Sequence, residues 1–174
     1  MLKRNPNTLS IGDQNTVIAL NEQEVGKLFV GDTRSDIGSE AEKMKFANSV
    51  NDLVVKFIRL DVNEQLNADM LVMERLYPID FRAYEFERKE LWLEVFEDEI
   101  ATMHKAGFVH RDITRPSNMP GLQYDNIFLT ETGLRLIDVG ISALKSQVGE
   151  RLFARYVEIE LKEIKEFEEY FLMR

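Results

Sequence analysis

Three polar groups in the second half of the chain limit its fold more than any other feature. Asp112 lies in a short charged stretch, Asn126 precedes one apolar run, and Asp138 ends the next. Between the two runs stands Glu131-Thr132-Gly133, a composition that predicts a β-hairpin. A hairpin would bring Asn126 and Asp138 close together, and an amide oxygen beside a carboxylate suits Mg²⁺, which keeps several waters and takes other ligands from phosphates.

The rest of the chain reads as strands followed by helices. Alternating apolar residues and turn residues predict two short strands within 8–20 and single strands over 24–30, 53–60 and 68–76. Apolar spacing predicts helices over 35–48, 80–106 and from 146 onward. Gly107 is the expected C-cap of the long helix, and either Asp36 or Ser39 is the expected N-cap of the first.

The last helix is expected to be amphipathic and acidic. Its predicted apolar face consists of Phe153, Val157, Leu161, Ile164 and Phe171. A sheet-rich front and a helical back are typical of α+β organisation, and residues 1–174 are expected to form a single domain because no linker or repeat interrupts them.

Composition excludes several classes of function. The net charge of −9 argues against nonspecific binding to nucleic acid or to an anionic membrane, and it suits a basic protein partner. The absence of cysteine excludes disulfides and thiolate metal sites, and two histidines do not make a histidine-rich one. No apolar run approaches the ~20 residues of a membrane span, and no signal peptide is evident, so the expected compartment is the cytoplasm, with secretion into a host cell as an alternative.

The segment from His104 to Asp112, ending in His110-Arg111-Asp112, resembles the catalytic loop of the protein-kinase fold, and Asp138-Val139-Gly140 resembles its metal-binding turn. The resemblance implies that Asp112 acts as the catalytic base, that His110 is structural, and that Asn126 and Asp138 bind Mg²⁺. Valine replaces the usual phenylalanine of the turn, so an aromatic packing contact is lost.

The spacing of the catalytic loop differs from that of the family. Kinases usually place the asparagine five residues after the aspartate, whereas Asn126 follows Asp112 by fourteen and Asn118 follows it by six. We favour Asn126 because an apolar strand follows it directly, and Asn118 remains the rival. Residues 115–124 are then an insertion in the loop.

The first part of the chain resembles the nucleotide-binding lobe of kinases. Val25-Gly26-Lys27 is similar to the strand whose lysine reaches the α- and β-phosphates and pairs with a glutamate of the next helix. Both Glu40 and Glu42 are candidates for that glutamate. Only Gly12 stands where the family has a glycine-rich phosphate loop, and Asp13 beside it is unfavourable for phosphate, so this loop is degenerate.

The same resemblance implies an adenine site. Val17 and Val25 would cover the base from above and Phe128 from below. Backbone groups of Glu74 and Leu76 would meet its edge at the position of the family's hinge. Val17, Val25 and Phe128 are each more simply explained as part of an ordinary core.

Only 34 residues follow Gly140, too few for the later helices of a full kinase. The chain therefore resembles minimal kinases, including effector kinases of type III secretion systems, with an antiparallel-sheet N-lobe over about 1–76, containing one helix, and a truncated, mostly helical C-lobe over about 77–174. Arg111 binds a phosphorylated activation loop in full kinases. No such segment is expected here, which leaves a protein partner as the expected activator.

Three functions are compatible with this sequence. The first is transfer of the γ-phosphate of ATP, with Mg²⁺, to a serine or threonine hydroxyl of a protein. The second is a pseudokinase that keeps the fold and serves as a protein-binding module. The third is a small-molecule kinase, which the arginine of His110-Arg111-Asp112 and the short C-terminal part disfavour. The protein substrate and the oligomeric state are left open.

Overall fold

A computed structural model describes residues 8–11, 16–29, 36–114 and 123–173. The strands are β1 (Thr8–Ile11), β2 (Thr16–Ala19), β3 (Glu24–Phe29), β4 (Phe57–Asn63), β5 (Ala68–Glu74), β6 (Phe108–Val109), β7 (Ile127–Thr130), β8 (Gly133–Leu136) and β9 (Ala143–Leu144). The helices are α1 (Ile37–Val50), α2 (Phe86–Ala106), α3 (Lys145–Val148) and α4 (Glu150–Leu172), with one 3₁₀ turn at Phe81–Ala83.

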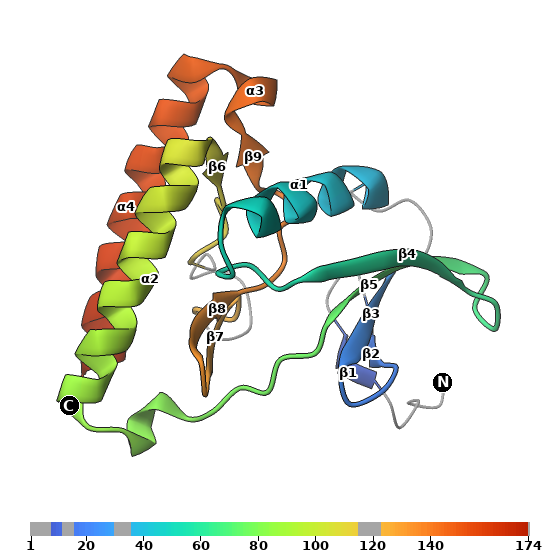
Figure 1. The fold of residues 1–174 in the computed structure, drawn as a ribbon, viewed down its shortest axis with the longest axis horizontal. Helices are drawn as coiled ribbons and strands as arrows, with labels where there is room; N and C mark the ends of the chain where they lie inside the picture. Colours follow the sequence, from blue (N-terminus) through green and yellow to red (C-terminus); the bar gives the residue numbers. More distant parts are fainter. Residues whose placement is uncertain (1–7, 12–15, 30–35, 115–122, 174) are drawn as a thin grey trace.

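The first five strands form one antiparallel sheet in the order β1-β2-β3-β5-β4. Helix α1 lies across one face of this sheet, while α2 and α4 run side by side on the other side of the molecule (Figure 1). The small pairs β7–β8 and β6–β9 lie between these two parts. The fold is therefore mixed α and β, with an antiparallel sheet, as the sequence predicts.

The hairpin expected around Glu131-Thr132-Gly133 is present as β7 and β8, with Ile127 opposite Leu136. Gly133 has a φ of 131°, which only glycine adopts readily. The predicted caps are also present. Asp36 accepts a hydrogen bond from the backbone N–H of Ser39 and caps α1, and Gly107 ends α2 with a φ of 101°.

The strand expected over 53–60 is wrong in its bounds, because β4 begins at Phe57 and continues to Asn63. The apolar residues Leu53, Val54 and Val55 are buried for another reason. The N–H of Val55 donates to the carbonyl of Leu136 at 2.8 Å, and the N–H of Leu136 donates to the carbonyl of Leu53 at 2.8 Å. This segment therefore joins the large sheet to β8 instead of extending β4.

The predicted C-terminal helix is interrupted. Gly149, with a φ of 81°, separates α3 from the long α4. The expected apolar face is also wrong at one position, because Leu161 is 47% exposed whereas Glu160 is buried. The tail of the helix packs as expected through Ile164 and Phe171, and Phe167 joins them in the same apolar cluster as α2 and the large sheet. Among the described residues, no helix has the length and apolar character that crossing a membrane requires.

Candidate functional site

Lys27, Glu40 and Asp138 come together from three distant parts of the chain. The ammonium of Lys27, on β3, lies 2.7 Å from Oε1 of Glu40 on α1 and 2.8 Å from Oδ1 of Asp138 after β8. Lys27 and Glu40 are buried, whereas the side chain of Asp138 is 47% exposed. One buried cation thus holds two carboxylates, and the outer one is open to a ligand.

The charges of this trio are coupled. Burial lowers the pKa of Lys27, but the charges of Asp138 and Glu40 raise it more, so the ammonium form is favoured. Partial burial raises the pKa of Asp138, and the charge and hydrogen bond of Lys27 outweigh this and hold it below its usual range. Burial dominates at Glu40 and raises the pKa of its carboxyl despite Lys27. Asp138 is therefore ionised and available to bind a cation.

The turn that carries Asp138 is held in an uncommon conformation. Asp138 has a φ of 56°, in the left-handed region that non-glycine residues seldom adopt. Its Oδ1 accepts a hydrogen bond from the N–H of Gly140 at 3.3 Å, and Lys43 of α1 donates to the carbonyl of Gly140 at 2.8 Å. His110, which is buried, lies with Nε2 2.8 Å from the carbonyl of Ile137. These contacts fix the direction of the Asp138 side chain.

Asp112 and Asn126 form the second part of the site. The side-chain amide of Asn126 donates to the backbone carbonyl of Asp112 at 3.0 Å. The backbone carbonyl of Asn126 accepts from the N–H of Ile137 at 3.0 Å, which places Asn126 next to Asp138 in the fold. The hairpin therefore brings together the polar groups that the sequence singled out.

The carboxyl of Asp112 has a raised pKa. Burial is the main cause of the raised pKa, and the nearby charge of Asp138 raises the pKa further. The charge of His110 and a hydrogen bond from Asn126 lower it, but by less. A raised pKa moves a carboxylate toward the range in which it can accept a proton near neutral pH. Asp112 is thus suited to act as a base.

A contact that the sequence did not predict joins α4 to this loop. Glu160 is 1% exposed, and its Oε2 accepts from the backbone N–H of Arg111 at 2.5 Å while its Oε1 lies 2.9 Å from Nε2 of His104. The guanidinium of Arg111 lies 3.8 Å from the centre of the Tyr156 ring and donates to the carbonyl of Ile141 at 3.0 Å. Since Arg111 has a φ of 70°, these contacts hold a strained backbone directly before Asp112.

Glu163 lies one turn beyond Glu160 on α4, and its Oε2 is buried with no hydrogen-bond partner in the described part of the chain. Burial is the main cause that raises the pKa of Glu163 to about 7, with the charges of Glu160 and Asp112 adding to it. A carboxyl with a raised pKa favours folding when protonated. Its contribution is therefore complete below the ordinary value of 4.5 and is lost as pH rises toward 7.

We expect Glu163→Gln to stabilise the protein at pH 8 by about 1–2 kcal/mol, after allowing for partial exposure to solvent, and to change stability little at pH 4. Urea unfolding at both pH values measures this difference. Glu158→Gln, at an exposed position of the same helix, is the matched control and should show no such dependence on pH. Equal effects of Glu163→Gln at pH 4 and pH 8 would contradict the expectation.

Only some of the residues expected around an adenine lie together in the structure. Val17 and Val25 lie on the same face of the sheet as Lys27, since Val17 pairs with Lys27 and Val25 is two residues from it. Both pack in the main apolar cluster, together with Leu76. Phe128 is half-buried and is not a member of that cluster.

Glu74 and Leu76, the residues expected at the hinge, differ in their hydrogen bonds. The side chain of Glu74 pairs with Arg135 at 2.8 Å, and its backbone N–H donates to the carbonyl of Lys56. Leu76 makes no backbone hydrogen bond within the described ranges.

Glu42 is exposed and accepts a hydrogen bond from Gln147 at 3.4 Å, so Glu40 is the glutamate that pairs with Lys27. Gly12, Asp13 and Asn118 lie outside the described residues.

The donor set fits a hydrated magnesium ion better than a closed metal centre. No group of three or more histidine, aspartate or glutamate side chains suited to a metal is present in the described residues. Asp138 and Asn126 supply one carboxylate and one amide. Such a pair is typical of Mg²⁺ sites, where water and phosphate oxygens complete the shell.

No protein-family model matches this sequence, and no curated protein matches it. Among solved structures, the chain is similar to the Legionella pneumophila Lpg2603 kinase bound to IP6, with a TM-score of 0.62 and 17% sequence identity. The similarity covers 91% of this chain and 57% of that kinase, so this chain spans little more than half of its length. At this identity the likeness concerns the fold alone, and the fold of this chain is kinase-like.

Proposed function

We propose that this protein binds ATP together with Mg²⁺ and transfers the γ-phosphate to a serine or threonine hydroxyl of a protein. The observation that carries the proposal is the convergence of Lys27, Glu40, Asp112, Asn126 and Asp138, which come from separate elements of a kinase-like fold. Phosphoryl transfer needs little covalent chemistry from the protein, so positioning and charge compensation by a few such groups suffice.

The proposed roles follow from the surroundings of each side chain. Lys27, kept charged by its two carboxylates, would bind phosphate oxygens, and Glu40 would hold its ammonium in place. Asp138 and Asn126 would hold Mg²⁺, whose charge stabilises the phosphate oxygens when it is bound. Asp112 would orient the substrate hydroxyl and accept its proton.

The adenine would lie against Val17 and Val25, with its edge toward the hinge. The backbone N–H of Leu76 makes no hydrogen bond to the described residues and is available as a donor there. The protein substrate, and a protein partner that activates the enzyme, are proposals that rest on the fold alone. The pseudokinase alternative predicts partner binding that is indifferent to the Asp112 and Asp138 carboxylates.

Calorimetric titration with ATP, with and without Mg²⁺, tests the nucleotide site. We expect binding to strengthen when Mg²⁺ is present and Asp138→Asn to remove most of that gain, about tenfold or more, because the variant loses the carboxylate that faces the metal. Glu131→Gln, in the exposed turn between β7 and β8, is the control and should bind like the unmodified protein. A folded protein that binds no nucleotide, with or without Mg²⁺, would favour the pseudokinase.

A further inference from the structure

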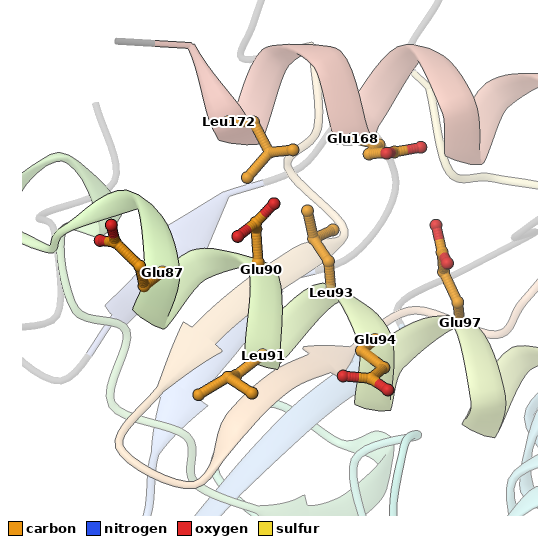
Figure 2. A pocket seen from close by; sticks show the side chains of 8 residues that line it. All are labelled: Glu87, Glu90, Leu91, Leu93, Glu94, Glu97, Glu168 and Leu172. Carbon is orange, nitrogen blue, oxygen red and sulfur yellow. The ribbon is translucent and has the colours of Figure 1, made fainter.

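A groove runs between α2 and α4, far from the proposed nucleotide site. Its volume is about 560 Å³, and the residues that line it are Glu87, Glu90, Leu91, Leu93, Glu94, Glu97, Glu168 and Leu172. Figure 2 shows Glu90, Leu93 and Glu97 projecting from α2 toward α4 and Leu172 projecting back from α4, whereas Leu91 and Glu94 lie on the side of α2 away from α4. From Glu94 to the end of α2 the helix rises roughly 20 Å, so the groove is remote from Asp112.

The side chains that line the groove are either acidic or apolar. Five of its eight residues are glutamates and the other three are leucines, with no lysine or arginine among them. Within the described residues, none of the five glutamates lies within ion-pair distance of a cation. Partial burial and the charges of Glu168 and Asp98 raise the pKa of Glu97. The groove thus concentrates negative charge that the protein itself does not neutralise.

The apolar residues extend beyond the groove. Leu93 is 4% exposed and forms part of the floor, whereas Leu91 and Val95, each 56% exposed and each two residues from Leu93, lie on the other side of α2. Exposed apolar residues at this spacing form a ridge against which another chain can pack. Glu87 and Glu94 flank Leu91 at spacings of four and three, so the outer rim of the groove combines exposed apolar side chains with carboxylates.

A metal ion does not explain this arrangement. The described residues contain no group of three acidic side chains close enough to hold one. The carboxylates are spread along three turns of α2 and the end of α4, so the positive charges that match them must be spread in the same way. Nucleic acid and anionic lipid are repelled, and a second copy of a chain with a net charge of −9 is repelled as well. A protein segment with several lysines or arginines beside apolar residues meets all of these conditions.

We propose that the groove between α2 and α4 is a docking site for a basic amphipathic segment of a partner protein. Leu91 and Val95, on the outer rim, would receive its apolar side chains, and the glutamates beside them and in the groove would pair with its lysines or arginines. Docking here is independent of catalysis, because none of the lining residues belongs to the proposed nucleotide site.

The test is fluorescence anisotropy with two labelled peptides of identical composition. One places lysines on one face of a helix and leucines on the other, and its partner has the same residues in scrambled order. We expect the amphipathic peptide to bind at least about tenfold more tightly, because the scrambled one keeps the charge but not the apolar face. Equal binding of both peptides, or no binding of either, would overturn the proposal.

Variants locate the binding surface. Glu94→Lys with Glu97→Lys should weaken binding of the amphipathic peptide by about tenfold or more, and Leu91→Ser by about threefold or more. Glu22→Lys with Glu64→Lys, in two exposed turns of the large sheet, makes the same change in net charge and should alter binding by less than about threefold. Equal losses in both double variants would mean attraction by net charge and would overturn the site.

Two further measurements distinguish a basic partner from unfolding of the variants and from a second copy of this chain. Circular dichroism and urea unfolding should show that the groove variants are folded, and their binding of ATP with Mg²⁺ should match that of the unmodified protein. Sedimentation of the unmodified protein should show no self-association through the groove. A dimer that the Glu94 and Glu97 reversals dissociate would identify a second copy as the occupant and would refute the basic partner.

Discussion

Asp112→Asn is expected to reduce phosphoryl transfer to a protein substrate by about 10²–10⁴-fold while leaving the binding of ATP with Mg²⁺ within about twofold. The substitution preserves the shape of the side chain and the backbone carbonyl that Asn126 binds. It removes the carboxylate that the proposed mechanism needs in order to accept the proton of the hydroxyl. Single-turnover transfer of labelled phosphate, measured beside calorimetric binding, separates the two effects.

The pH dependence gives a second signature of Asp112. Because burial raises the pKa of its carboxyl, transfer should increase with pH as the group loses its proton and should then level off. Glu131→Gln, in the exposed turn between β7 and β8, is the matched control and should retain that profile. An Asp112→Asn variant that keeps more than half of the activity would refute the assignment of the base.

Glu160→Ala is expected to have the largest effect on stability, a loss of about 2–5 kcal/mol. The variant leaves the N–H of Arg111 and Nε2 of His104 without their acceptor in a buried place. It also releases the left-handed backbone of Arg111, so transfer should fall even at temperatures where the variant is folded. Glu160 would then be a positioning residue, because it touches the loop and not the reacting atoms.

Urea unfolding and the kinetics of Glu160→Gln test this role. The amide keeps the size of the side chain and one acceptor oxygen, so its stability should lie between those of the unmodified protein and Glu160→Ala. Glu158→Ala, at an exposed position two residues earlier, should change stability by less than about 0.5 kcal/mol. A Glu160→Ala variant as stable as Glu158→Ala would show that the contact with Arg111 and His104 contributes nothing.

The pairing of Lys27 was predictable from helical geometry. Glu40, Met44 and Ala47 follow one another at spacings of four and three and share the buried face of α1, whereas Glu42 lies on the exposed side. The spacing to the next strand does not distinguish Glu40 from Glu42, whereas the face of the helix on which each lies does. The hairpin that unites Asn126 and Asp138 was predicted because its turn composition is strongly specific.

The burial of Glu160 and the pairing of the segment at Leu53 could not be predicted from the sequence. Glu160 lies seven residues after Phe153 and four before Ile164, so its spacing places it on the buried face of α4. A glutamate at such a position is normally assigned to solvent, and only its partners in the folded chain make its burial favourable. The sequence predicts that the segment at Leu53 belongs to the same strand as residues 57–60. An apolar run does not reveal which strand it pairs with, and this one pairs with β8.

The pairing of residues 53–55 with β8 also connects the large sheet to the strand that precedes Asp138. Its two backbone hydrogen bonds lie at the side of the large sheet where β4 begins, and Asp138 follows β8 by only two residues. The large sheet and the turn that carries Asp138 are therefore joined through the backbone as well as through the ion pair of Lys27 with Asp138. A displacement of either part would strain both connections, so the sheet and this turn are expected to keep their relative position.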